Sequence, residues 1–324
     1  MQDNKSEMSI DIGREEEKEV SFNSEEISLF FNTNSFILGN NDKERRSSSH
    51  SYRILREHED IPLPSGLIPR IEYSKKHLEF LSIPFGPPYI MLNMDVVEKL
   101  TDKGLTANEI YPYGKIITTS TIHDDILCNF TVKHEIDIIT KFDPAWHIPC
   151  DYPTYFEDSD EGREWFIDAS IEDTLSFIEA TDDTSIRVIP LVKGINAGEW
   201  KRSISPFQNR GINHFAFYVK QYFGRNNGKN DKLMVEHIRC LIHSCDPNYL
   251  MLIGYQSQLR VQDIPPEVQA FAGERWIRGS KMNNLNSQQA RLEYQNWRSK
   301  FEVQEIVRQT VLKIKDESLL REGD

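Results

Sequence analysis

Residues 130–158 read FTVKHEIDIITKFDPAWHIPCDYPTYFED and contain the unit from which the fold is predicted. The first part, 130–142, carries apolar residues at helical spacing, so we expect an amphipathic helix. The apolar run 147–150 then predicts a strand, which Pro153 ends because proline has a fixed φ and no N–H group to donate. Asp151 therefore stands at the carboxyl end of a strand that follows a helix.

The same alternation extends from this unit in both directions. Further strands are expected over 87–93, 114–120, 185–192, 212–219, 249–254 and 268–277, and further helices over 94–103, 162–181, 196–209 (interrupted at Pro206) and 231–244. Alternating strands and helices are typical of parallel βαβ units, and continuously apolar strands indicate a sheet that is covered on both faces. We predict an α/β fold, a (β/α)8 TIM-type barrel over residues 61–285, with a doubly wound open sheet as the alternative.

The two ends of the chain differ from this pattern. Residues 1–60 are polar and acidic, with REEEKE at 14–19, and we expect a mostly flexible arm. Residues 286–324 predict a C-terminal helix that would pack on the barrel, dimerise or bind a polyanion. The formal charge of −13 argues against indiscriminate binding of nucleic acid, but it leaves room for a local basic patch.

The four cysteines and the hydropathy indicate the compartment. We find no secretory segment and no apolar run of membrane length, so we expect a cytoplasmic protein with reduced thiols. The stretch HIRCLIHSC (237–245) suggests zinc, but it also forms a good helix, and four ligands on one short helix cannot converge on a tetrahedral ion. We therefore expect no resident metal and no cofactor.

Chemistry in a barrel takes place at the carboxyl ends of the strands. These ends are expected at Asn93, at 121–124, at Asp151, at Lys193 and Gly194, at Lys220, and at Gly254 and Tyr255. Asp151 lies among aromatic residues, so it is either an acid/base or base-recognition group, or a loop aspartate that bonds nearby backbone.

Four of these strand ends resemble the tRNA-guanine transglycosylase superfamily, particularly its archaeal branch. Asp151-Tyr152-Pro153-Thr154 is similar to the family's Asp-x-Pro-Thr element at the end of a barrel strand. IPLVKG (189–194), NRGINHFAFYV (209–219) and NYLMLIGY (248–255) resemble the next three strand segments of the family, in the same order. The agreement covers roughly residues 85–280, and each motif is a hypothesis that the fold must support.

The resemblance implies a pentosyltransferase that exchanges a guanine or 7-deazaguanine base in tRNA or DNA. One carboxylate would attack the sugar C1′, which the position of Glu274 suggests, and Asp151 would move protons on the base or read its edge. The implied base-binding residues are Tyr152, Lys193, Gly194, Tyr218, Gly254 and Tyr255, and the implied phosphate-binding residues are Arg275, Arg278 and Lys281. The implied partners are a nucleic acid, a purine or 7-deazapurine base, and a homo-oligomer or homologous subunit.

Three departures from the family keep two alternatives open. The family's purine-gripping Asp-Ser-Gly turn is missing, since the nearest acids here are Asp124 and Asp125. Residues 271–276 contain Glu274 where the family has its nucleophilic aspartate, and the family's zinc-binding cysteines are absent. The first alternative is a catalytically silent relative that binds nucleic acid or a partner subunit. The second is an unrelated metal-dependent barrel enzyme with His123, Asp124, Asp125 and Asp151 as ligands.

Overall fold

The computed structural model describes residues 61–81, 86–127, 130–156, 158–223, 230–257 and 261–321. The expected flexible arm over 1–60 lies outside these residues. Within them, no helix is both long enough and apolar enough to cross a membrane.

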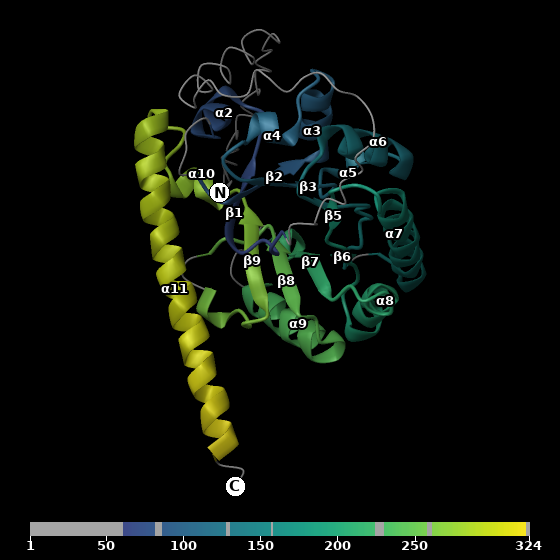
Figure 1. Ribbon diagram of the computed structural model, residues 1–324. Helices are drawn as coiled ribbons and strands as arrows, with labels where there is room; N and C mark the ends of the chain where they lie inside the picture. The colour runs from purple at the N-terminus through teal and green to yellow at the C-terminus, as the bar shows by residue number, and fades with distance from the viewer. Residues whose placement is uncertain are drawn as a thin grey trace, which may run out of the picture.

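A nine-stranded parallel sheet forms the centre of the molecule, and helices surround its curled strands (Figure 1). The strands are β1 Gly66–Ile71, β2 Tyr89–Asn93, β3 Lys115–Thr119, β4 Trp146–Ile148, β5 Arg187–Val188, β6 Leu191–Val192, β7 His214–Tyr218, β8 Tyr249–Ile253 and β9 Val268–Gly273. Their order is β5-β4-β3-β2-β1-β9-β8-β7-β6. The α/β class with parallel βαβ units is thereby confirmed.

Helices connect the strands and cover the outside of the sheet. They are α2 Lys75–Leu81, α3 Met94–Thr101, α4 Ala107–Ile110, α5 Asp124–Leu127, α6 Val132–Phe142, α7 Asp160–Ala180, α8 Ala197–Gln208, α9 Asn230–Cys245, α10 Arg275–Gly279 and α11 Ser287–Arg321, with 3-10 turns η2 Lys220–Tyr222 and η3 Val261–Asp263. The expected interruption at Pro206 is wrong, because α8 continues to Gln208. The missing N–H of a proline removes only one helical bond, and Pro206 lies in the last turn.

The first and last strands of that order are consecutive in the chain. β5 pairs with β4, β6 pairs with β7, and only Ile189 and Pro190 separate β5 from β6. The Ile189 N–H donates to the His147 carbonyl at 2.9 Å, and the Pro190 carbonyl accepts from the Ala216 N–H at 2.9 Å. The stretch expected as one strand over 185–192 therefore bonds to β4 with its first half and to β7 with its second half.

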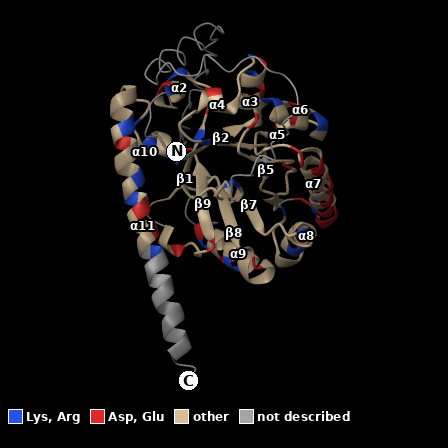
Figure 2. Cartoon of the chain, in the orientation of Figure 1, with Lys and Arg blue, Asp and Glu red and all other residues tan. Residues whose placement is uncertain are grey.

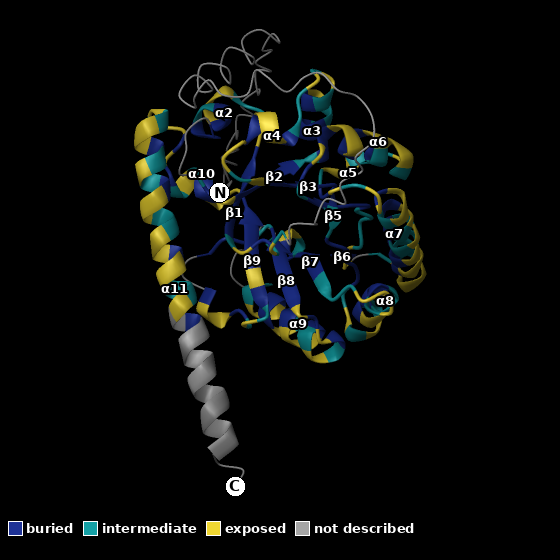
Figure 3. Ribbon diagram, in the orientation of Figure 1, coloured by how far each residue is buried: buried dark blue, intermediate teal, exposed yellow. Residues whose placement is uncertain are grey.

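Every strand except β5 contributes to one cluster of buried side chains on the inner face of the sheet, and Ile189 joins it from the link between β5 and β6. Its members are Ile68, Tyr89, Met91, Ile117, Trp146, Ile148, Ile189, Leu191, Ala216, Tyr249, Met251, Ile253, Ala270 and Ala272. Two further clusters lie between the sheet and the helices, and Figure 3 shows buried strands inside helices whose outer faces are exposed. The strands are thus covered on both faces, as their continuously apolar sequence predicts.

Two strands differ from the sequence expectation. β1 was not expected, and its sequence GLIPRI contains Pro69, a residue that is unusual inside a central strand. The structure accommodates Pro69 because β1 pairs with β9 through Gly66–Pro69 and with β2 through Arg70 and Ile71. The strand expected over 268–277 ends at Gly273, and α10 begins at Arg275.

The C-terminal helix α11 packs along one edge of the molecule, beside α2, α10 and β1 (Figure 1). Its Arg308 guanidinium is buried and donates to the carbonyls of Ile264 and Val268. Packing on the barrel was one of the three roles expected for this helix, and the structure shows the helix packed on the sheet.

Candidate functional site

A cavity of about 470 Å³ opens at the carboxyl ends of the strands. Five of the eight residues predicted as catalytic or base-binding line it, namely Asp151, Lys193, Gly194, Tyr218 and Glu274. They come from the ends of β4, β6, β7 and β9. The volume lies within the range of about 300–1,000 Å³ that is usual for small-molecule sites.

Asp151 forms an ion pair with Lys193 inside this cavity. The two side chains are 10% and 6% exposed, so the pair is largely removed from water. The Lys193 N–H donates to the Ser203 hydroxyl at 3.0 Å, which holds the end of β6 against α8. Gly194 follows at φ 104°, and a Cβ there would lie 2.5 Å from the Glu199 Cβ, so this turn requires glycine.

The backbone that leads to Asp151 is unusual. Cys150 has a φ of 55°, a left-handed conformation that costs about 1–3 kcal/mol for a residue other than glycine. Side chains on both sides bind the peptide: the Ser170 hydroxyl donates to the Cys150 carbonyl at 3.1 Å, and the Asp151 N–H donates to the Ser120 hydroxyl at 2.9 Å. This geometry turns the chain sharply between β4 and the cavity.

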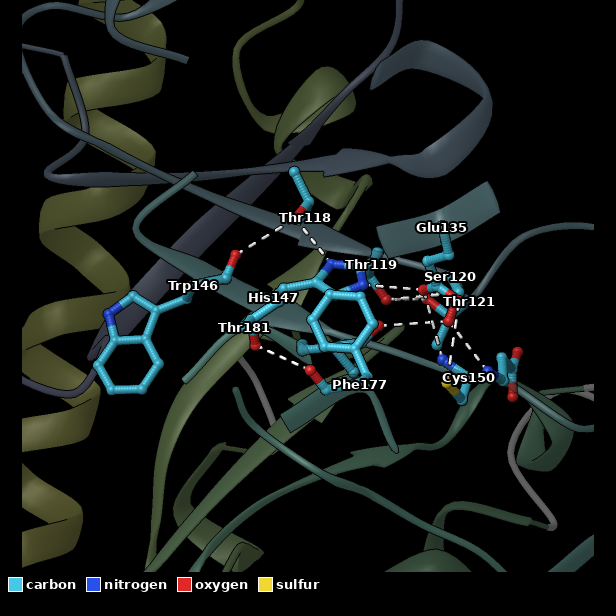
Figure 4. A network of polar contacts seen from close by, with 12 residues as sticks. Thr118, Thr119, Ser120, Thr121, Glu135, Trp146, His147, Cys150, Phe177 and Thr181 are labelled. Atoms are coloured by element: carbon cyan, nitrogen blue, oxygen red, sulfur yellow. Dashed lines mark hydrogen bonds and ion pairs between the residues drawn. The ribbon is translucent and has the colours of Figure 1, made fainter. Parts of the chain in front are cut away.

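A buried polar network lies behind this turn, as Figure 4 shows. His147 is fully buried, and its Nε2 contacts the Glu135 Oε1 at 2.8 Å while its Nδ1 contacts the Thr118 hydroxyl at 2.8 Å. Since a carboxylate only accepts, Nε2 carries the proton that points at Glu135. The Glu135 Oε1 also accepts from the Cys150 N–H at 3.4 Å. Burial, reinforced by Glu135, raises the pKa of the Cys150 thiol.

Glu274 is held much more loosely than Asp151. It follows β9, its side chain is 45% exposed, and its nearest cation is the Arg70 Nε at 3.9 Å. Arg70 is itself buried at the end of β1, where it donates to the Asn93 side-chain oxygen and to the Thr121 carbonyl. Arg70 therefore carries a fixed positive charge into the cavity.

Two tyrosines add hydroxyl groups to the cavity wall. Burial raises the pKa of Tyr218, with Arg70 opposing and Asp151 and Glu274 reinforcing the shift. The phenol therefore stays protonated at neutral pH and is available as a donor. The Tyr155 hydroxyl donates to the Asp124 Oδ2 at 2.8 Å at the rim.

A second cavity of about 810 Å³ adjoins the first. Gly254, Tyr255, Arg275 and Arg278 line it, and it shares Arg70, Lys220 and Glu274 with the first cavity. Tyr255 is buried with its ring stacked on Phe223, at a centroid distance of 5.7 Å, so it supports the wall. Lys281 does not line either cavity, and its ammonium group lies 3.3 Å from Glu293 on α11.

Tyr152 does not join the other base-binding candidates. Its hydroxyl donates to Asp173 on α7, and its ring lies 6.2 Å from that of Phe166. The side chain is thereby directed towards α7, because the sharp turn at Cys150 sends successive side chains to different sides. Tyr152, predicted to bind the base, therefore does not line either cavity.

His123, Asp124 and Asp151 of the metal hypothesis line the same cavity, but they do not form a set of metal ligands. The His123 Nδ1 lies 3.5 Å from Asp125, both side chains are strongly exposed, and Asp124 accepts from Tyr155. In the segment considered for zinc, His237 instead contacts the Tyr222 hydroxyl at 2.8 Å. Across the described ranges, no group of three or more His, Cys, Asp or Glu side chains is arranged to hold a metal ion.

Two residues of the site were missed from the sequence. Arg70 was missed because β1 was not expected as a strand. Glu135 carried a signal, since it stands at helical spacing with Ile138, Ile139 and Phe142 on the buried face of α6. A carboxylate on an apolar helix stripe needs a buried partner, which the sequence does not identify.

Comparisons with known proteins identify no relative. No protein-family model matches the chain, and no curated protein matches it. The chemistry of the site is therefore argued from its own residues.

Proposed function

We propose that the protein is a transglycosylase-like enzyme that exchanges a guanine or 7-deazaguanine base in tRNA or DNA. The observation that carries this proposal is that two carboxylates from distant parts of the chain, Asp151 and Glu274, line one cavity of small-molecule size. Base exchange requires two carboxylates with different roles, and these two differ in burial and in partners.

The exposed and loosely held Glu274 suits the role of nucleophile. Its carboxylate would form a bond to the sugar C1′ as the bond from C1′ to the base nitrogen breaks and its electron pair goes to the base. Arg70 would direct the carboxylate and stabilise its charge before the attack. In the second half of the reaction an incoming base loses a proton, bonds to C1′ and releases the carboxylate.

The Asp151–Lys193 pair suits proton transfer and recognition of the base. Its ammonium group can donate to the leaving base, and its carboxylate can accept from an N–H of the base edge. Tyr155 and Tyr218 provide aromatic surface and hydroxyl groups at the same cavity. Removal from water strengthens each of these interactions.

The second cavity suits the phosphate backbone of the nucleic acid. Arg275 and Arg278 line it together with Arg70 and Lys220, and phosphates are bound mainly by such side chains. Figure 2 shows acidic residues along α7, which disfavours a polyanion at that face. The cytoplasm is the compartment we propose for this reaction, and the thiols of Cys150, Cys240 and Cys245 are unpaired.

The proposal includes a closed (β/α)8 barrel of the TIM type. The segment β5–β6 bonds to β4 and to β7, which are the neighbours it would have as one strand of an eight-stranded ring. The inner cluster, which draws on eight of the nine strands and on Ile189 between β5 and β6, supports closure over the doubly wound alternative, in which helices cover both faces.

The proposal is tested by incorporation of radiolabelled guanine or 7-deazaguanine into tRNA and into DNA. We expect incorporation with the native chain and a loss of at least about 100-fold in D151N, the scale typical of acid–base groups. D125N is the matched control, since Asp125 is exposed at the same rim and does not line the cavity. Exchange that survives D151N in an active protein would overturn the assignment.

One observation favours a second candidate function, a catalytically silent relative that binds nucleic acid. Asp151 and Glu274 already have cationic neighbours, Lys193 and Arg70. Such a protein would bind tRNA or DNA with a salt dependence that R275A and R278A reduce, yet incorporate no base. Detectable turnover by the isolated chain would exclude this candidate.

A further inference from the structure

The turn before Asp151 differs from the other places in the described chain where a residue other than glycine has a left-handed conformation. Asp143, Asp246 and Lys281 also have positive φ, but each follows a helix, where left-handed residues commonly end the helix. Cys150 follows the strand β4 instead. Strained backbone of this kind persists only when the surrounding structure holds it in place.

Glu135 is at the centre of what holds this turn. Its Oε1 accepts from the His147 Nε2 at 2.8 Å and from the Cys150 N–H at 3.4 Å, and its Oε2 lies 3.9 Å from the Cys150 thiol. The carboxylate is only 3% exposed and belongs to α6, which precedes β4 in the chain. It therefore links a helix, a strand and the turn through one side chain, as seen in Figure 4.

His147 fixes Glu135 in turn. The ring has hydrogen-bond partners at both nitrogens, Glu135 on one side and Thr118 of β3 on the other, and it packs against Phe177 of α7 at 4.7 Å. A buried network in which the members satisfy one another is rigid and has few alternative arrangements. This rigidity is transmitted through the Cys150 peptide to the next residue, Asp151.

We propose that Glu135 is a positioning residue that aims Asp151 at Lys193 by holding Cys150 in its left-handed conformation. Glu135 does not line the cavity and would not touch a ligand there. A role of Glu135 in catalysis rests on the proposed function, whereas the effect of Glu135 on the Asp151–Lys193 pair is independent of any substrate. The two are therefore tested separately.

The substrate-free test is trace acylation of lysines followed by peptide mass spectrometry. Lys193 is protected by burial and by Asp151, so D151N defines the labelling rate of an unpaired Lys193. We expect E135L to raise labelling of Lys193 at least about threefold by loosening the turn, and E135Q, which keeps an acceptor oxygen, to leave it near the native rate. Ile238→Ala, a core change on α9, is the control for a general loss of stability.

A second pair of variants keeps the test decisive if E135L does not fold. S170A removes only the bond to the Cys150 carbonyl and should raise labelling by a smaller factor. Glycine adopts positive φ without strain, so the double variant E135L/C150G should show less labelling of Lys193 than E135L alone. Native-like labelling in both E135L and S170A, or labelling no higher than in Ile238→Ala, would overturn the proposal.

Binding of free guanine by calorimetry separates this proposal from the proposed function. If guanine binds, we expect E135L to weaken it about tenfold and E135Q to retain it. Guanine binding with unchanged Lys193 labelling in E135L would refute the positioning role alone. Increased labelling in E135L, with no binding or exchange of any base by the native chain, would refute the proposed function alone.

Discussion

Asp151 and Glu274, which both line the cavity, are held in opposite ways. Asp151 is nearly buried, paired with Lys193, and preceded by a strained residue that a network from four elements supports. Glu274 is 45% exposed, follows β9 at the start of α10, and has one distant cation, Arg70, at 3.9 Å. The two acids therefore share a cavity but differ in rigidity and in solvation.

This difference assigns the roles in the proposed reaction. A side chain that recognises a base by hydrogen bonds must be held in position before the base binds, because displacing it by about 1 Å can reduce the reaction rate 100-fold. A nucleophile must approach C1′ and withdraw again, so a side chain with freedom to move is suited to it. The contrast between a buried, paired acid after β4 and a half-exposed acid after β9 can be tested on stability as well as on activity.

The largest effect is expected from removing Asp151. D151A leaves the Lys193 ammonium buried and unpaired, so we expect the free energy of unfolding to fall by about 3–5 kcal/mol, measured by urea denaturation. The double variant D151A/K193M should recover most of this loss, since it removes the uncompensated charge. A loss below about 1 kcal/mol in D151A would show that the pair is effectively solvated.

An intermediate effect on stability is expected when His77, which interacts with Glu274, is titrated with acid. Burial lowers the pKa of His77 to about 4, with the charge of Glu274 opposing, and its ring centroid lies 5.1 Å from that of Trp276 of α10. Between pH 6.5 and 4 the His77 side chain is protonated in the unfolded chain but not in the folded chain. The free energy of unfolding therefore falls as the pH is lowered through this window, by up to about 3 kcal/mol.

This pH effect is isolated by comparison with H77F. Urea denaturation at pH 7, 5.5 and 4.5 should give a smaller decrease in stability for H77F than for the native chain. Other titrating groups contribute equally to both proteins, and the lost acceptor for the Glu72 N–H is a constant offset. Parallel pH profiles would mean that His77 is protonated without cost in the folded protein.

The smallest effect on stability is expected from E274Q. The side chain is half-exposed and Arg70 keeps its bonds to Asn93 and Thr121, so the free energy of unfolding should change by less than about 1 kcal/mol. Base exchange, in contrast, should be lost because the amide is not a nucleophile. A large destabilisation in E274Q would contradict the contrast between the two carboxylates.

Much of the fold was predictable from the sequence because local patterns specify it. Short apolar runs and helical stripes identified every strand except β1, and they placed Asp151 and Lys193 at strand ends. The local rules failed at two prolines. β1, which contains Pro69, was not predicted as a strand, and at Pro190 one expected strand changes its pairing partner from β4 to β7. Proline is excluded from strands only where its missing N–H would be needed, and that depends on the neighbours.

The sequence by itself determined the alternation of strands and helices, the parallel sheet and the acid at the end of β4. Only the tertiary structure decided which polar groups share a cavity. Arg70, Asp151 and Glu274 lie far apart in the chain, and Tyr152, next to Asp151, faces α7 instead. The physical reason is that periodicity fixes which face a residue occupies, whereas the direction of a side chain after a strand depends on the contacts that hold the turn, here those of Glu135, Ser120 and Ser170.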